Sequence, residues 1–280
     1  MPIKFKVSKE KILDGLQRVQ NVVSTRTTLP ILSNALLQAG TEGLSLTTTD
    51  LDVGVRCSVE AEVSKAGATT LPARKLFTIL KEMPAAEVEV EVDEKNAAAF
   101  RGGNSFYKIM GLPEDEFPPF PKAAAAKALK LDQAALREML KKSAYAVSND
   151  ETRYVLNGVY MSFKADKLTI VATDGRRLAL VEHEMEVPKG SESEFILPTK
   201  AVGELQRLLG EKGDVTMAVG ENQIIFTMEG TTLVSKLIKG TYPNFRQVIP
   251  TEAKERRSEE HTSELQSHSD LVCRLLLEKK

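Results

Sequence analysis

The feature that most constrains this chain is an internal repeat with a period near 125 residues. The stretch 170–180, IVATDGRRLAL, is typical of an apolar strand, a tight Asp-Gly turn and a second strand. A similar pattern of strand, Thr-Asp and strand occurs at 44–55, so that Asp174 follows Asp50 by 124 residues. A chain made of two such copies is expected to fold as two like domains.

Three further landmarks keep the same spacing. Each copy opens with a short strand and an amphipathic helix, which Ser8 caps in the first copy and Asp132 caps in the second. A second helix follows a Leu-Pro step, and each copy closes on an aromatic-proline motif, at 117–120 and 242–245. We therefore predict an α+β fold of two tandem pseudo-repeats, each with two helices on one face of antiparallel sheets, with a continuous outer sheet.

The repeat and the composition also predict the domain boundaries. We expect a first domain at 1–121, an Ala-rich linker at 122–128, a second domain at 129–250 and a tail at 251–280. A third copy would begin near residue 256, but the sequence changes character there. Residues 257–280 resemble a translated sequencing adapter, so we expect this tail to be non-native and to lack defined packing.

Composition and motifs disfavour an enzyme. Two cysteines and three histidines give neither a disulfide framework nor the spacing of a metal site. Phosphate-binding glycine loops and zinc-protease motifs are absent from the sequence. Asp50 and Asp174 occupy equivalent places in separate copies, so we interpret them as turn residues and leave an enzyme that uses either as the least favoured alternative. We expect no catalytic residues, no cofactor and no metal.

The expected location is cytoplasmic. The N-terminal stretch, MPIKFKVSKEK, lacks the apolar segment of a signal peptide. No apolar run approaches the ~20 residues that a membrane-spanning helix needs.

Charge is distributed unevenly between the predicted helices and the rest of the chain. The four helices carry eleven basic and six acidic residues, whereas the chain to residue 256 is neutral overall. If the helices line one face, that face is basic and suits a phosphate backbone, without aromatic residues placed for reading bases. The alternative, which charge alone favours, is a set of solvated helix faces.

The best candidate for a binding site follows the second Asp-Gly turn. Arg176, Arg177 and Leu178 place cations beside apolar surface, and YPNFRQVIP at 242–250 adds aromatic and apolar residues. This mixture suits a groove for a short peptide with hydrophobic and acidic anchors. The alternative is a salt-bridged loop.

The motifs together resemble the bacterial β sliding clamp family, the processivity subunit of the replicative DNA polymerase. The resemblance covers residues 1 to about 250, in order, and it is carried by these stretches: TLPILSNALLQ, LSLTTTDLDV, TTLPARKLFTIL, RYVLNG, VATDGRRLAL, LPTKAVGELQRLL and SKLIKGTYPNFRQVIP. It implies the DNA-clamp fold: a homodimeric ring with three like domains per subunit, helices lining the hole and sheets outside. The partners implied are double-stranded DNA, held without sequence preference, and the replicative polymerase, the clamp loader and repair proteins, which dock through short linear motifs.

The resemblance also implies residue roles. The second-domain half of the peptide pocket would comprise Leu156, Thr173, Gly175, Arg176, Arg177, Leu178, Pro243 and Val248. The residues facing DNA would be Arg26, Tyr154 and Lys200, and one side of the ring interface would include Lys75, Tyr107 and Ile109. Gln247 and Val155 depart from the family pattern, which has an arginine and an aromatic residue at these two positions.

Two functions remain open from the sequence. The favoured one is a non-enzymatic clamp that tracks DNA and is nucleoid-associated in the cytoplasm. The alternative is a two-domain peptide-binding adaptor that does not close a ring. Because a third copy is missing, we expect the chain as written to be monomeric, whereas a full-length form would be a homodimer.

Overall fold

Each half of the chain begins with a strand that runs directly into a helix. The computed structural model describes residues 3–23, 29–121, 128–188 and 190–249. The first half contains β1 (Ile3–Ser8), α1 (Lys9–Val19), β2 (Asn34–Gly40), β3 (Gly43–Thr49), β4 (Val53–Val59), β5 (Glu62–Lys65), β6 (Gly67–Pro72), α2 (Ala73–Glu82), β7 (Glu87–Val92), β8 (Ala97–Gly102) and β9 (Ser105–Met110).

The second half repeats this order without a counterpart of β5. It contains β10 (Ala128–Asp132), α3 (Gln133–Ser143), β11 (Gly158–Lys164), β12 (Lys167–Thr173), β13 (Leu178–Glu184), β14 (Ser193–Pro198), α4 (Thr199–Leu208), β15 (Asp214–Val219), β16 (Gln223–Met228) and β17 (Thr231–Lys236). Short 3₁₀ turns include η3 (Ala144–Ala146), η4 (Glu151–Leu156) and η5 (Phe245–Val248).

The strands form three antiparallel sheets whose order repeats. The order β1-β7-β8-β9 in the first domain matches β10-β15-β16-β17 in the second, and β4-β3-β2-β6 matches β13-β12-β11-β14. The prediction of two like copies is therefore confirmed. The predicted continuous outer sheet is wrong in detail, because only the eight-stranded sheet crosses from one domain to the other.

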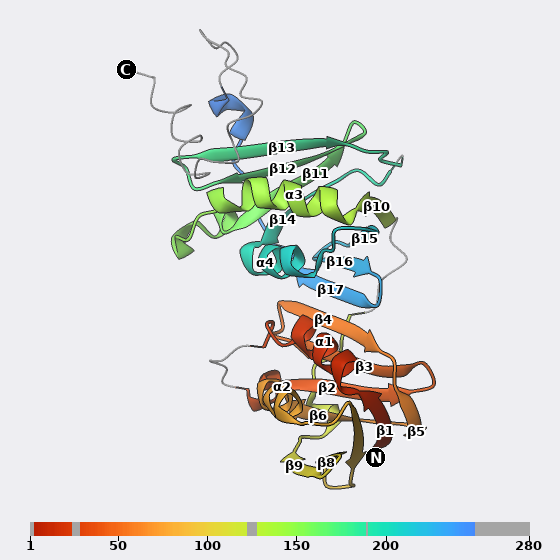
Figure 1. Ribbon diagram of the computed structural model, residues 1–280. Coiled ribbons are helices and arrows are strands. Elements are labelled where there is room, and N and C mark those ends of the chain that lie inside the picture. Colours follow the sequence, from red (N-terminus) through yellow and green to blue (C-terminus); the bar gives the residue numbers. More distant parts are fainter. Residues whose placement is uncertain (1–2, 24–28, 122–127, 189, 250–280) are drawn as a thin grey trace, which may run out of the picture.

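The domains are joined edge to edge by β17 and β4. Their antiparallel ladder runs from Thr231 opposite Cys57 to Ser235 opposite Val53, and it continues the hydrogen bonding of the sheet. Figure 1 shows the second domain above the first, with β17 and β4 meeting between them and the four helices in front of the sheets. The hydrogen bonds of one sheet therefore join the two domains, in addition to the contacts between their side chains.

Amphipathic helices close the core against the sheets. On α1, the residues Ile12, Leu16 and Val19 are fully buried, as their helical spacing predicts. Helix α1 packs on β3, β4 and α2, while α3 packs on β12, β13 and α4. The predicted cap at Asp132 is confirmed, since its side chain accepts the Ala135 N–H at 2.9 Å. Ser8 occupies the cap position of α1 without a side-chain hydrogen bond to the helix.

Several predicted segments lie wholly or partly outside the described residues. These are the 251–280 tail and most of the 122–128 linker, of which Ala128 already belongs to β10. Within the described ranges, none of the helices has the length and apolar character required to cross a membrane.

Two helical glycines give a matched test of this packing. A Cβ on Gly15 of α1 would lie 2.5 Å from Cγ2 of Val59, whereas a Cβ on Gly203 of α4 would meet nothing within 4 Å. We expect Gly15→Ala to destabilise the fold by about 1 kcal/mol, because overpacking exceeds the gain in helix propensity. Gly203→Ala should stabilise it by about 0.5–1 kcal/mol. Urea unfolding of both variants checks this, and equal shifts would contradict the packing.

Candidate functional site

The candidate site is built on the turn between β12 and β13. Gly175 has a φ of +87°, a conformation that glycine adopts readily. The Thr173 hydroxyl donates to the carbonyl oxygen of Arg177 at 2.7 Å and accepts the Gly175 N–H at 3.1 Å. At the equivalent turn of the first domain the chain has Leu51, with a φ of +81°.

Asp174 holds the turn through both carboxylate oxygens. Its Oδ1 accepts the backbone N–H groups of Arg176 and Arg177 at 2.9 and 3.0 Å, and its Oδ2 lies 3.1 Å from Nε of Arg177. Partial burial opposes the charged form, but the backbone N–H groups and the guanidinium outweigh it and lower the pKa of Asp174. In the first domain, Asp50 likewise accepts two backbone N–H groups of its own turn. The prediction that both aspartates are turn residues is confirmed.

The two arginines after the turn differ in their surroundings. The Arg177 guanidinium is paired with Asp174 and lies 5.6 Å from the ring centre of Tyr145 on η3. Arg176 is exposed and has no ion pair within the described part of the chain. The alternative interpretation, a salt-bridged loop, therefore holds for Arg177. Arg176 is free to contact a ligand.

A separate apolar cluster lies beside the turn. Leu156, Val171, Ile196 and Tyr242 form its buried part, and partly buried residues pack around them: Val155, Tyr160, Leu178, Ile238 and Phe245. The rings of Tyr160 and Tyr242 are stacked, with centroids 5.1 Å apart. The structure thus brings Leu156 and Leu178 together as an apolar floor next to the cationic turn.

The predicted outer residues of the pocket are exposed. Pro243, Gln247 and Val248 follow Tyr242 on the segment that contains η5, and Val248 is 69% exposed. Tyr145 and Arg153 were missed by sequence reasoning. Arg153 donates from Nη1 to the carbonyl oxygen of Asp174 at 3.4 Å, a contact for which the sequence carries no signal because the two residues are 21 positions apart.

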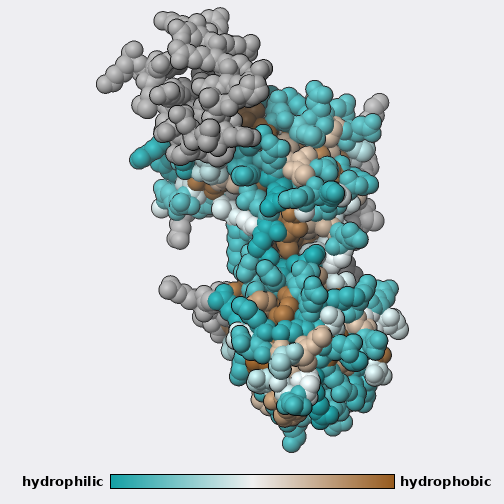
Figure 2. All heavy atoms as spheres, viewed as in Figure 1, coloured by the Kyte–Doolittle hydropathy of each residue, from teal (hydrophilic) through white to brown (hydrophobic). Residues whose placement is uncertain are grey.

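The helix face carries fewer free cations than its composition suggests. Six of its eleven basic residues are engaged by carboxylates or by backbone carbonyl groups: Lys9, Lys11, Arg18, Lys142, Lys200 and Arg207. In the described ranges, the basic helix residues with neither an ion pair nor such a carbonyl contact are Arg74, Lys75, Lys81, Arg137 and Lys141. Figure 2 shows hydrophilic residues over most of the visible face, with hydrophobic atoms at the level of the junction.

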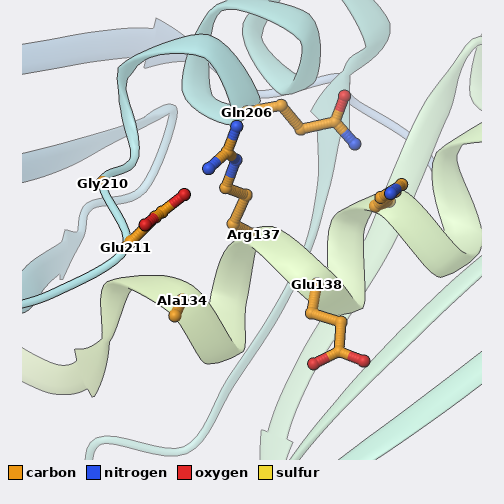
Figure 3. A pocket seen from close by; sticks show the side chains of 7 residues that line it. Ala134, Arg137, Glu138, Gln206, Gly210 and Glu211 are labelled. Carbon is orange, nitrogen blue, oxygen red and sulfur yellow. The ribbon is translucent and has the colours of Figure 1, made fainter.

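Two of the free cations line a groove between α3 and α4. Its volume is about 490 Å³, and its lining includes Arg137 and Lys141 from α3 and Gln206 from α4. Figure 3 shows Arg137 extending from α3 toward α4 and Glu138 pointing away from it. An extended guanidinium and a nearby amide can donate to the oxygens of a phosphate group.

The residues predicted to face DNA have three different outcomes. Tyr154 is 59% exposed on η4. Lys200 forms an ion pair with Asp50 across the domain junction and donates to the Val22 carbonyl oxygen at 3.4 Å, and its side chain remains 45% exposed. Arg26 lies outside the described residues.

The predicted ring interface falls on β9, a free edge of the five-stranded sheet in the described structure. Tyr107 and Lys75 are exposed, as an outward surface requires. The prediction for Ile109 is wrong, because its side chain is only 2% exposed and packs in the first-domain core. Phe106 and Met110 take its place as exposed apolar side chains of this edge.

Family models match both halves of the chain. The model described as DNA polymerase III beta subunit, N-terminal domain, matches residues 3–121, and the model for the central domain matches residues 130–244. Proteins named beta sliding clamp are similar over most of the chain. The protein from Chlamydia muridarum is 33% identical over 251 residues, and that from Bacillus subtilis is 30% identical over 261 residues. In both cases the match covers 90% of this chain and 69% of the relative.

Solved structures show the same likeness. The DNA polymerase sliding clamp from Bacillus subtilis has a TM-score of 0.87 at 29% identity, over 90% of this chain and 69% of that one. A sliding clamp (DNA polymerase III subunit beta) from Bartonella birtlesii bound to griselimycin has a TM-score of 0.85 at 37% identity, with the same coverage.

The pKa of Tyr242 provides a test of how the apolar floor is packed. Burial raises the pKa of its phenol from the ordinary value of 10 to about 12. The folded state therefore holds a proton that the unfolded state releases, and stability should fall as pH rises from about 10 to 12, by about 2 kcal/mol. Tyr242→Phe should remove this part of the alkaline loss. Urea unfolding over that pH range checks the difference, and parallel curves for the two proteins would contradict it.

Proposed function

Because this chain belongs to the DNA polymerase III beta subunit family, the bacterial sliding clamps, we propose that its two described domains form part of a ring around double-stranded DNA. The ring would tether the replicative polymerase and other proteins without catalysing a reaction. The observation that carries this proposal is the β17–β4 junction, which joins like domains edge to edge and leaves all four helices on one side. A repeated junction of this kind curves the helices toward a common centre.

The helix-lined face supplies contacts to the phosphate backbone. Its free cations are spread over α2 and α3. The groove beside Arg137 offers hydrogen-bond donors from Arg137, Lys141 and Gln206, with Glu138 and Glu211 also in its lining and no aromatic platform for bases. Such contacts carry no sequence information and let a protein move along DNA. Tyr154 would add a polar, exposed contact, and Arg26 keeps its proposed role as a DNA-facing cation.

The turn at Gly175 and the apolar floor form the second-domain half of a site for short linear motifs. Leu156 and Leu178 would receive an apolar anchor of the motif, and Arg176 would pair with an acidic or carbonyl group. The polymerase, the clamp loader and repair proteins would share this site in turn. Gln247 replaces a cation at the rim, so polar contacts there would be weaker than with an arginine.

The edge of β9 would form one side of the subunit interface in a closed, homodimeric ring. Tyr107, Phe106 and Met110 provide its apolar surface, and Lys75 lies on the neighbouring helix.

A peptide-binding adaptor is the second candidate. The observation that favours it is that the apolar floor and the cationic turn are complete within the second domain. Retention on circular and linear DNA separates the two functions. A ring is held on the circle and slides off the linear ends, whereas an adaptor leaves both at the same rate.

The α3–α4 groove can be tested with a double variant. Replacing Arg137 and Lys141 with alanine should weaken binding to a double-stranded oligonucleotide and reduce the slope of log affinity against log salt by about two. The matched control replaces Lys4 and Lys6 of β1, which are paired with Glu89 and Glu87. An equal loss in the control would show that the effect comes from net charge alone.

The peptide site can be tested with Arg176→Ala. Binding of a short peptide with acidic and apolar residues should weaken about tenfold, because the exposed guanidinium that would pair with an acidic group of the peptide is lost. Arg101→Ala, at an exposed position on β8, is the control. Fluorescence anisotropy of a labelled peptide measures both, and unchanged binding by the Arg176 variant would contradict the site.

A further inference from the structure

The edge strand β14 is less completely covered than β6, its equivalent in the first domain. Each of the two strands lies at one end of its sheet and ends in Leu-Pro. Figure 1 shows β14 on the side of its sheet nearest to β17. In both domains an isolated bridge joins this strand to the segment after the last strand of the domain, Thr70 with Leu112 and Ile196 with Ile238. The two copies of this contact differ in their hydrogen bonds.

In the first domain, both bonds of the bridge are made. Thr70 and Leu112 exchange backbone hydrogen bonds at 3.1 Å in each direction, and the Thr70 hydroxyl donates to the Leu112 carbonyl oxygen at 2.9 Å. The Thr69 hydroxyl donates to the side-chain oxygen of Asn96 at 3.2 Å. The 3₁₀ turn η2 (Glu114–Glu116) then packs against β6. The chain itself therefore covers the edge of β6.

In the second domain, only one bond of the bridge is made. The Ile238 N–H donates to the Ile196 carbonyl oxygen at 3.0 Å, but the reverse bond, from the Ile196 N–H, is missing among the described residues. Phe195 and Ile196 stand in place of the two threonines, so the hydroxyl bonds are lost as well. In the described part of the chain, no counterpart of η2 follows this bridge. The segment after β17 therefore covers β14 less than the equivalent segment covers β6.

A groove with a volume of about 480 Å³ lies beside β14. It is lined by β14, by residues 237–240 and by the turn between β15 and β16, so the second domain alone forms it. Ser193 lines the groove, and its buried hydroxyl oxygen has no hydrogen-bond partner in the described residues. Glu221 and Lys239 are exposed in the lining and contribute charges of opposite sign. Net charge is therefore not what would select a ligand here.

Backbone groups of Glu194 face the groove. In an antiparallel sheet, alternate residues of a strand direct their N–H and C=O groups to the same side. The Ile196 carbonyl oxygen is bonded on the side of Ile238, away from β11. The N–H and C=O groups of Glu194 therefore also point away from β11, where the described structure has no partner strand for them.

We propose that the edge of β14 binds a peptide in the extended conformation, which adds a strand to the second-domain sheet. The peptide backbone pairs with Glu194, and the peptide side chains lie in the groove. An edge strand with unpaired backbone groups is a template for such pairing, in which main-chain hydrogen bonds provide the affinity. The site lies next to the apolar floor, with which it shares Ile196 and Ile238, but it does not include the turn at Gly175. It requires neither the ring nor the motif site.

A short labelled peptide of alternating valine and threonine residues is the probe, because β-branched residues favour the extended conformation. Its backbone is N-methylated at every second residue, so that it keeps one pairing edge and cannot form sheets with itself. Fluorescence anisotropy should show saturable binding to the 280-residue chain. The same peptide methylated at every residue should bind at least tenfold more weakly, because it has no N–H donors left.

Two variants of one residue locate the site. Glu194→Pro should weaken binding about tenfold or more, because it removes the N–H that faces the groove; edge strands tolerate proline at such a position. Glu194→Gln is the matched control: it removes the ion pair with Lys164 but keeps the backbone groups, and it should bind normally. In the unaltered chain, the bound peptide should also slow hydrogen exchange of the Glu194 amide, which locates the site without a variant.

Four results would each overturn the proposal. The first is the absence of saturable binding to the unaltered chain, and the second is equal binding of the two methylated peptides. The third is a folded Glu194→Pro variant that binds as the unaltered chain does, or a Glu194→Gln variant that is weakened to the same extent. The fourth is unchanged exchange of the Glu194 amide at saturating peptide, which decides the question even if the proline variant does not fold.

Discussion

The rest of the structure depends on the hydrogen-bonded ladder between β17 and β4. It joins the two domains into one extended body, because the sheet continues from the second domain into the first. Helix α4 reinforces the ladder, with Lys200 bound to the first-domain turn and Arg207 bound to the end of α1. The position of α1 and α2 relative to α3 and α4 follows from this junction.

The duplicated turn has different surroundings in the two domains. In the first domain, Asp50 holds its turn with one carboxylate oxygen and accepts Lys200 with the other, so the turn is part of the junction. In the second domain, Asp174 holds the same turn, but Gly175 and Arg176 remain open to solvent. The turn that we propose as a ligand site in the second domain thus contacts the neighbouring domain in the first.

Much of the fold could be predicted from the sequence. The helices, their buried faces and the order of strands follow local patterns that recur with the repeat, as the cap at Asp132 illustrates. Pairing between β17 and β4 could not be predicted, because strand edges carry no local signal for a partner in another domain. For the same reason the ion pair between Lys200 and Asp50, which are 150 positions apart, could not be predicted. The burial of Ile109 could not be predicted either, because β9 does not alternate regularly between buried and exposed residues.

The direction of the hydrogen bonds in the junction has a mechanical consequence. In an antiparallel sheet these bonds lie perpendicular to the strands, so a force that separates the two domains stretches the whole β17–β4 ladder together. Bending about an axis parallel to the two strands changes the bond lengths far less. The junction is therefore stiff against a force that pulls the two domains apart, and it is more compliant when the domains bend relative to each other.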